Sequence, residues 1–184
     1  MDINSLRYLT KSDFFKEKFL FKNRPLHCTF ELTYKCDLRC RHCFRVEEER
    51  EELSTSEVYR ILEELAEEGC LKVGFTGGEI FIRPDCIELL EYARKLKFVV
   101  TLLTNATLLT PRIVKILARL NIYHIQISFY GPNKELHDQH TGVNGSFERV
   151  IEGLKLLLGE KLPVTINCLV NRYNFPMYRE LLDF

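Results

Sequence analysis

Two kinds of hydrophobic pattern alternate along most of this chain. Short runs rich in β-branched and aromatic residues predict strands, and longer segments with apolar residues every three or four positions predict amphipathic helices. The predicted strands cover residues 27–32, 71–75, 98–103, 122–129 and 164–170. A helical pattern follows each of them, so the chain contains five predicted strand–helix units.

Capping residues mark where several of these helices begin and end. Ser54 with Glu57 three positions later has the form of a capping box, and Gly69 suits the end of the same helix. Thr110 before Pro111 is typical of an N-cap followed by the first helical position. Further helices are predicted over residues 84–95 and 146–159 and from residue 176 onward.

Strict alternation of strands and helices predicts an α/β fold around a parallel sheet. Right-handed crossovers then place the carboxyl end of every strand at one edge, where ligands bind in such folds. The most unusual sequences each follow a strand: CDLRCRHC (36–43), TGGE (76–79), TNAT (104–107) and SFYG (128–131). We therefore expect a site built from these four loops.

The first 25 residues fit no strand–helix unit. Their aromatic and apolar positions predict a short amphipathic helix that covers one end of the sheet. The chain is accordingly divided into a helical extension, residues 1–25, and a core, residues 26–184.

Composition excludes several classes of protein. With 184 residues, 46% hydrophobic and 28% charged, the chain has the makeup of one globular domain. Its 26 basic and 26 acidic residues cancel, so the net charge favours neither nucleic acid nor an anionic membrane as a partner. No apolar stretch reaches the roughly 18 residues of a membrane-spanning helix, and the N-terminus lacks the pattern of a secretory signal. We expect a cytoplasmic protein whose seven cysteines are thiols, ligands or catalysts rather than disulfides.

Three cysteines stand close together, Cys36, Cys40 and Cys43, with the spacing C-x3-C-x2-C. Thiolates are soft ligands that select zinc, copper(I) or iron–sulfur clusters. A zinc site would need a fourth ligand, such as His42, but the chain has no second C-x2-C and no H-x3-H pair. Three thiolates on a [4Fe–4S] cluster would leave one iron open to bind another molecule.

This motif, with His42 directly before its last cysteine, resembles the signature of the radical S-adenosylmethionine (SAM) enzymes. The resemblance implies an oxidoreductase core built as a (βα)6-type barrel, with a [4Fe–4S] cluster on the three cysteines and His42 beside the adenine of SAM. In that family the amino and carboxylate groups of SAM bind the fourth iron. Reductive cleavage of SAM then gives methionine and a 5′-deoxyadenosyl radical, which abstracts a hydrogen atom from the substrate.

Other positions match this family in the expected order. Gly77, Gly78 and Glu79 resemble the GGE motif, which receives the amino group of SAM. By the same resemblance, Asn105 lines the cavity and Ser128 contacts the ribose and methionine end of SAM. The glycines would let backbone approach a ligand, and Glu79 would accept a hydrogen bond from an ammonium group.

Residues 137–158 resemble the peptide- and protein-modifying branch of the family, the SPASM-type maturases. That resemblance implies a peptide or protein substrate, and an electron donor such as a flavodoxin or ferredoxin. Within this stretch His137 and His140 flank Asp138, and the two histidines are expected to serve in capping and hydrogen bonding in the loop before Ser146 rather than in acid–base catalysis.

Six strand–helix units form the core in this family, and relatives of the branch add a cysteine-rich C-terminal domain with auxiliary clusters. This sequence has five units and stops within the fifth helix, so it is expected to be the N-terminal part of such an enzyme. Two alternatives remain open: a non-catalytic module that binds zinc or an iron–sulfur cluster, and an inactive fragment of a longer enzyme.

Overall fold

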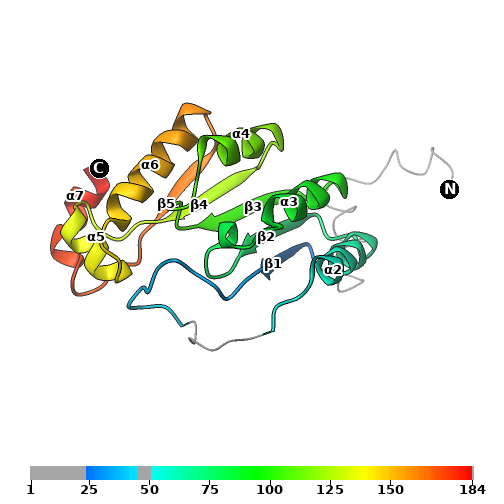
Figure 1. Cartoon of the computed structure of the whole chain (residues 1–184), viewed down its shortest axis with the longest axis horizontal. Coiled ribbons are helices and arrows are strands. Elements are labelled where there is room, and N and C mark those ends of the chain that lie inside the picture. Colours follow the sequence, from blue (N-terminus) through cyan, green and yellow to red (C-terminus); the bar gives the residue numbers. More distant parts are fainter. Residues whose placement is uncertain (1–23, 45–50, 184) are drawn as a thin grey trace, which may run out of the picture.

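The computed structural model describes residues 24–44 and 51–183 (Figure 1). Five strands form one sheet, in which all pairings between neighbours are parallel. They lie in sequence order: β1 (His27–Glu31), β2 (Lys72–Thr76), β3 (Val99–Thr104), β4 (His124–Ser128) and β5 (Val164–Asn167). The predicted α/β fold with a parallel sheet is therefore confirmed. The amphipathic helix predicted near the N-terminus lies outside the described residues.

Helices connect the successive strands: α2 (Thr55–Glu67), α3 (Cys86–Lys95), α4 (Pro111–Arg119), α5 (Lys134–Thr141) and α6 (Ser146–Gly159). Short 3-10 helices cover Ile80–Ile82 (η3) and Phe175–Met177 (η4), and α7 (Tyr178–Asp183) follows directly. None of the helices in the described part of the chain has the length and hydrophobicity that a bilayer crossing requires.

The predicted capping residues begin α2 and α4. The Ser54 hydroxyl accepts a hydrogen bond from the Glu57 amide, and the Glu57 carboxylate accepts one from the Ser54 amide at 2.8 Å. The Thr110 hydroxyl accepts a hydrogen bond from the Ile113 amide, with Pro111 at the first helical position. Hydrogen bonds from residues close in sequence therefore fix the first residues of these two helices, as the sequence predicted.

Helix α5 corrects the expectation that His137 and His140 lie in a loop before Ser146. The segment KELHDQHT has one aliphatic side chain, Leu136, and its buried residues are polar: His137, Asp138, His140 and Thr141. Hydrophobic periodicity cannot reveal a helix whose buried face is polar, because the method looks for apolar residues at helical spacing. Its ends carry ordinary signals, with Asn133 as N-cap and Gly142 in the left-handed conformation after the last turn.

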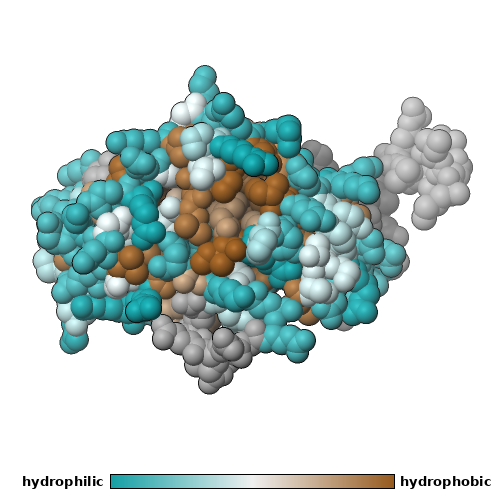
Figure 2. All heavy atoms as spheres, in the orientation of Figure 1, coloured by the Kyte–Doolittle hydropathy of each residue, from teal (hydrophilic) through white to brown (hydrophobic). Residues whose placement is uncertain are grey.

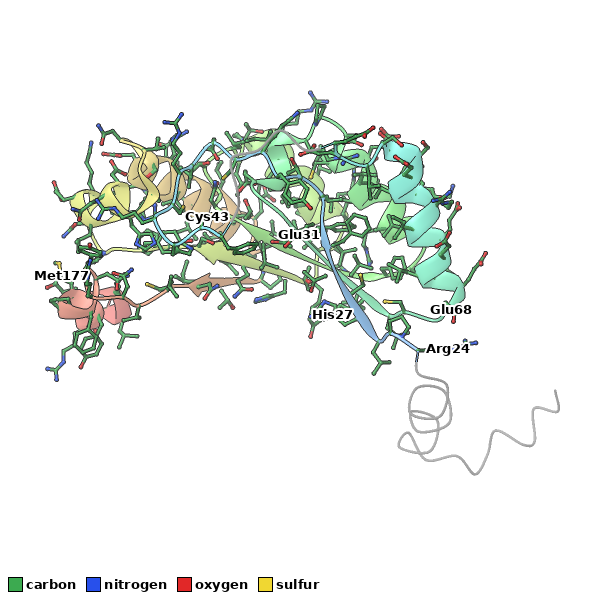
Figure 3. All side chains as sticks on the ribbon, turned by 90° about the horizontal axis from the view of Figure 1, so that it is seen from below. Arg24, His27, Glu31, Cys43, Glu68 and Met177 are labelled. Atoms are coloured by element: carbon green, nitrogen blue, oxygen red, sulfur yellow. The ribbon has the colours of Figure 1, made fainter. Side chains whose placement is uncertain are left out.

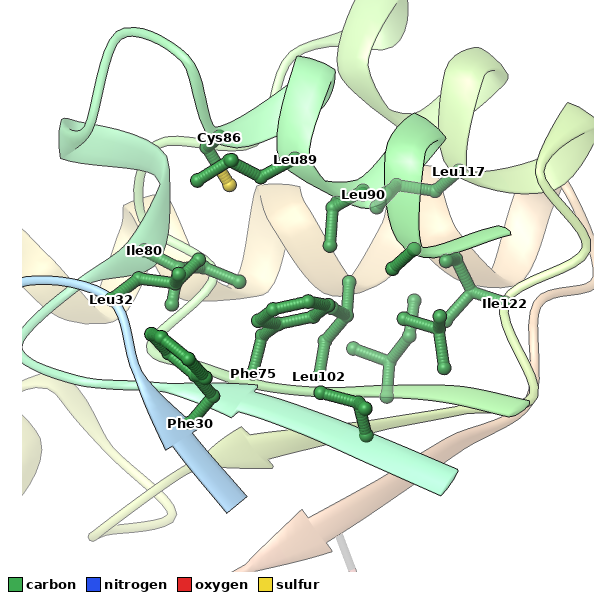
Figure 4. Close-up of a cluster of buried hydrophobic side chains, with 14 of the residues drawn as sticks. Phe30, Leu32, Phe75, Ile80, Cys86, Leu89, Leu90, Leu102, Leu117 and Ile122 are labelled. Carbon is green, nitrogen blue, oxygen red and sulfur yellow. The ribbon is translucent and has the colours of Figure 1, made fainter. Parts of the chain in front are cut away.

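The hydrophobic core lies between the sheet and the helices that pack along one of its faces (Figure 4). Phe75 and Leu102 point from the strands toward Leu90 and Leu117 of the helices, and all four side chains are fully buried. In the view of Figure 2, apolar side chains gather in the middle of the face and hydrophilic side chains surround them. This core fixes the carboxyl ends of the strands, and the loops that follow them carry the candidate site.

Candidate active site

A cavity of about 200 Å³ lies at the carboxyl ends of β1 to β4. Eight of the nine site residues predicted from the sequence line it: Cys36, Cys40, His42, Cys43, Gly77, Gly78, Asn105 and Ser128. Leu38, Phe44, Thr76, Leu103, Thr104 and Tyr130 complete the wall. Figure 3 shows Cys43 beyond Glu31, on the side toward which β1 runs. The expected meeting of four loops at one edge of the sheet is therefore observed.

The three cysteines of the loop after β1 share this cavity without converging on one point. In residues 24–44 and 51–183, no group of three His, Cys, Asp or Glu side chains is arranged to hold a single metal ion. A cubane cluster does not need such convergence, because each thiolate binds a different iron atom. The loop itself is tightly turned, since the Cys43 amide donates to the Cys40 carbonyl at 3.0 Å.

Gly77 and Gly78 have a structural role that the sequence did not suggest. A Cβ added to Gly77 would lie 2.4 Å from the Thr33 carbonyl oxygen, and one added to Gly78 would lie 2.1 Å from that of Lys35. The Gly78 amide donates to Thr33 O at 2.7 Å, and the Glu79 amide donates to Lys35 O at 2.8 Å. The two glycines therefore let the loop after β2 pack directly against the backbone that leads into the cysteines.

Glu79 is the predicted residue that does not line the cavity. Its side chain is completely buried, and its carboxylate accepts hydrogen bonds from the Thr104 hydroxyl (2.8 Å), the Asn105 amide (2.7 Å) and the Phe81 amide (3.2 Å). Burial raises the pKa of this carboxyl to about 7 despite those hydrogen bonds. Glu79 thus stands behind the wall of the cavity and holds Thr104 and Asn105, which form that wall.

Asp37 is a site residue that the sequence analysis missed. Its carboxylate accepts hydrogen bonds from the Asn105 side chain (2.8 Å), the Thr107 hydroxyl (2.6 Å) and the Arg149 guanidinium (3.3 Å). These contacts tie the cysteine loop to the loop after β3 and to α6. The one available signal was an acidic residue inside the cysteine motif, directly after Cys36.

The rings of His140 and Tyr130 lie beside His42. Nδ1 of His42 and Nε2 of His140 lie 2.6 Å apart, a hydrogen bond in which one ring nitrogen carries the proton. The Tyr130 ring stacks on His140 with centroids 4.2 Å apart, and its hydroxyl lies 3.4 Å from Nε2 of His42. Burial, with His42 and Arg41 nearby, lowers the pKa of His140 to about 4, so that its ring is neutral at pH 7. Tyr130 belongs to the SFYG loop expected at the site, whereas His140 was not predicted there, because nothing local links it to the cysteines.

The other cysteines lie apart from this site. Cys70 and Cys86 are buried in the hydrophobic core, and burial raises the pKa of the Cys86 thiol to about 12. Cys28 packs beside the core on β1, and Cys168 lies just after β5. None of these four cysteines lines the cavity.

Comparison with known proteins identifies the family. A model of the radical SAM superfamily matches residues 30–184. The chain belongs to this superfamily. The match covers β2 to β5, the end of β1 and every loop that lines the cavity.

Two curated proteins are among the similar sequences. The PqqA peptide cyclase of Bradyrhizobium diazoefficiens is 35% identical over 162 residues, which are 86% of this chain and 43% of that protein. The AdoMet-dependent heme synthase of Methanosarcina barkeri is 36% identical over 155 residues, which are 83% of this chain and 44% of that protein. The chain spans less than half the length of these radical SAM relatives.

Solved structures agree with this assignment. Streptococcus suis SuiB bound to S-adenosylmethionine superposes with a TM-score of 0.79 at 26% identity, over 98% of this chain and 45% of that one. SuiB bound to its precursor peptide SuiA gives a TM-score of 0.77 at 27% identity, over 92% of this chain and 38% of that one. The predicted partial radical SAM barrel is therefore confirmed as the fold.

Radical SAM proteins use a [4Fe–4S] cluster and SAM, and the residues at this cavity fit both groups. Three thiols from one tight loop match the three cluster irons that protein ligands hold. Polar groups of Asn105 and Ser128 lie on the same wall, where a polar cosubstrate could be bound. The cavity thus combines soft sulfur ligands with hydrogen-bonding groups.

Proposed function

We propose that this chain is the core part of a radical SAM enzyme that modifies a peptide. When bound, the reduced cluster would cleave SAM to methionine and a 5′-deoxyadenosyl radical, which removes a hydrogen atom from the substrate. The observation that supports the proposal most directly is one cavity that joins the three cysteines to the loops after β2, β3 and β4.

Different residues around the cavity would bind the cluster and SAM. Cys36, Cys40 and Cys43 would bind three irons as thiolates and leave the fourth iron to SAM. Asn105 and Ser128 would hydrogen-bond the methionine and ribose parts of SAM, and His42 would lie against the adenine. The backbone of Gly77 and Gly78 would face the methionine end.

Glu79 would attract the amino group of SAM electrostatically, although its carboxylate lies behind the residues that line the cavity. An ammonium group near the cavity favours the ionised form of a carboxyl whose pKa is about 7, by electrostatic attraction. The hydrogen bonds that Thr104 and Asn105 donate to Glu79 would then become stronger, because the carboxylate carries more negative charge.

The substrate class is inferred from relatives. PqqA peptide cyclases and SuiB bound to a precursor peptide are both among the similar proteins. We infer a peptide substrate for the enzyme that contains this core, and a small electron-transfer protein such as a flavodoxin or ferredoxin as the source of the electron.

Anaerobic reconstitution with iron and sulfide tests the proposal. The chain is expected to bind about four irons and four sulfides. With dithionite and SAM, the product 5′-deoxyadenosine is expected by chromatography. The variant with alanine at Cys36, Cys40 and Cys43 should bind no cluster, whereas the matched variant with alanine at Cys28 and Cys70 should bind it as the wild type does.

Other outcomes would decide against the proposal. Zinc instead of iron in the purified protein, removed by the triple alanine substitution, would indicate a closed structural metal site. A cluster that forms but gives no 5′-deoxyadenosine would indicate a binding module. The same assay on a longer chain that includes the following sequence would separate an inactive core from a wrong assignment.

A further inference from the structure

We infer that residues 134–146, here called the α5 brace, position the cysteine loop for cofactor binding. The brace consists of α5, the turn at Gly142 and the start of α6. The inference rests on the proposed function, because the loop that the brace holds is the proposed cluster loop. Three sets of contacts carry it.

The first set joins the end of α5 to the backbone of the cysteine loop. The last carbonyl groups of a helix have no partner within the helix and need one outside it. Here the Thr141 carbonyl accepts from the Arg39 amide at 2.8 Å, and the His140 carbonyl accepts from the Arg41 amide at 3.0 Å. Arg39 and Arg41 flank Cys40 on both sides, so the helix end fixes the backbone around the middle ligand.

The second contact is a steric one at Gly142. This glycine ends α5 with φ of 71°, and a Cβ added there would lie 2.8 Å from the Arg39 carbonyl oxygen. A side chain at this position would push directly on the cysteine loop. Glycine is therefore required at position 142 for two reasons: the left-handed backbone and the close approach of the two segments.

The third set fixes the brace itself. Asp138 on α5 accepts hydrogen bonds from the Gly145 amide (2.7 Å), the Phe147 amide (2.9 Å) and the Ser146 hydroxyl (2.8 Å). It thus caps the start of α6, whose own N-cap residue Gly145 has no side chain to do so. The Thr141 and Ser146 hydroxyl oxygens lie 2.6 Å apart, which joins the two helices again.

Together these contacts form a continuous path from α6 through Asp138 and the end of α5 to Cys40. Gly142 and Asp138 are positioning residues, because neither lines the cavity and both act through the backbone of the loop. The sequence HDQHTGVNGS consequently has a physical role that does not involve acid–base chemistry by its histidines.

A pair of glycine substitutions tests the inference on the full chain. Gly142→Ala and Gly145→Ala both place a methyl group on a backbone with φ near 75°, at 71° and 79°. The two variants therefore carry similar conformational strain. Only the methyl at position 142 meets the cysteine loop, because nothing lies within 4 Å of a Cβ at position 145.

Hydrogen exchange of the Arg39 and Arg41 amides, measured by NMR without cofactor, is the first readout. Gly142→Ala is expected to speed exchange at these two amides about tenfold relative to Gly145→Ala. The second readout is the electron paramagnetic resonance spectrum of the reduced cluster, whose signal should weaken or shift in Gly142→Ala alone. Equal exchange and equal spectra in the two variants would overturn the inference.

Two further results distinguish a failure of this inference from a failure of the proposed function. If the wild-type chain binds no cluster, the proposed function fails, while amide exchange still decides whether the brace holds the loop. If Gly142→Ala does not fold, Asp138→Ala replaces it, and it should also speed exchange at Arg39 and Arg41. Asp138→Asn keeps an oxygen acceptor for α6 and should restore most of the protection; no difference between the two Asp138 variants would contradict the capping step.

Discussion

The side-chain amide of Asn105 donates a hydrogen bond to the Asp37 carboxylate at 2.8 Å, although 68 residues separate them in the sequence. The Thr107 hydroxyl and the Arg149 guanidinium donate to the same carboxylate. The residue directly after Cys36 is thus held by three donors, and Asn105 is turned toward the cysteine loop. A substitution at Asp37 therefore changes the hydrogen bonds around the cysteine loop without removing a proposed cluster ligand.

Replacing Asp37 with alanine is expected to lower the free energy of unfolding by about 2–3 kcal/mol, because three donors lose their acceptor in a partly buried position. Glu91→Ala is the matched control, since Glu91 forms an exposed ion pair with Arg119 at 3.2 Å. That loss should stay below about 1 kcal/mol. Urea unfolding of the chain without cofactor measures both values, and equal losses would contradict the structural role of Asp37.

The stability of the protein should depend on pH through Glu79. Burial raises the pKa of its carboxyl from the ordinary 4.5 to about 7, so between these values the folded chain holds a proton that the unfolded chain has lost. This carboxyl alone therefore makes the free energy of unfolding fall as pH rises across this interval, by about 3 kcal/mol in the absence of SAM, whereas the lowered pKa values of His137 and His140 act in the opposite direction.

Glu79→Gln tests this dependence, because glutamine does not titrate. Chemical unfolding should show that, from pH 5 to pH 8, the free energy of unfolding changes in a more negative direction in the wild type than in the variant, because the histidines titrate in both proteins. An equal change with pH in the two proteins would show that the Glu79 pKa is not raised.

Gly78→Ala should disrupt the packing of two loops. Its methyl group would lie 2.1 Å from the Lys35 carbonyl oxygen, a distance at which backbone must move. We expect a loss of more than about 2 kcal/mol in the free energy of unfolding, a size typical of overpacking. Gly159→Ala at the end of α6 has open space around the new methyl and should be neutral or stabilising by about 0.5–1 kcal/mol. Thermal unfolding of the two variants gives the comparison, and similar melting temperatures would refute the close packing.

Arg83 anchors the backbone that leads from β1 into the site. Its guanidinium donates to the Leu32 carbonyl at 2.9 Å and to Asp85 at 2.7 and 3.0 Å, and its side chain is only 7% exposed. Arg83→Met leaves the Asp85 carboxylate without its cation, which should cost about 3 kcal/mol in the free energy of unfolding. Arg83→Lys keeps the charge but not the paired geometry, so its loss should be intermediate. Denaturant unfolding measures the stability of the two variants. A lysine variant as stable as the wild type would show that the paired hydrogen bonds do not contribute to stability.

The elements that the sequence predicted correctly are those with local signals. Alternating hydrophobic patterns and capping residues such as Ser54 and Thr110 act over a few positions, and the strands and most helices follow them. Most residues lining the cavity were also predictable, because they belong to short motifs at or after the ends of strands; Phe44 and Leu103 lie outside those motifs.

What the sequence could not provide are contacts between distant polar residues. The hydrogen bonds of Asp37 reach as far as Arg149, and those of His42 reach His140, with no local pattern to connect them. Helix α5 was missed for a related reason, since its buried face is polar. The burial of Glu79 behind Thr104 is likewise a property of the assembled sheet and not of the GGE motif.

The sequential order of the strands has a consequence for how the protein is made. Each strand pairs with the one synthesised just before it, so the sheet can grow in one direction as the chain leaves the ribosome. The end of α5, however, holds backbone that was made about a hundred residues earlier. On a nascent chain the backbone around Cys40 is therefore expected to lack these two hydrogen bonds until α5 has been made.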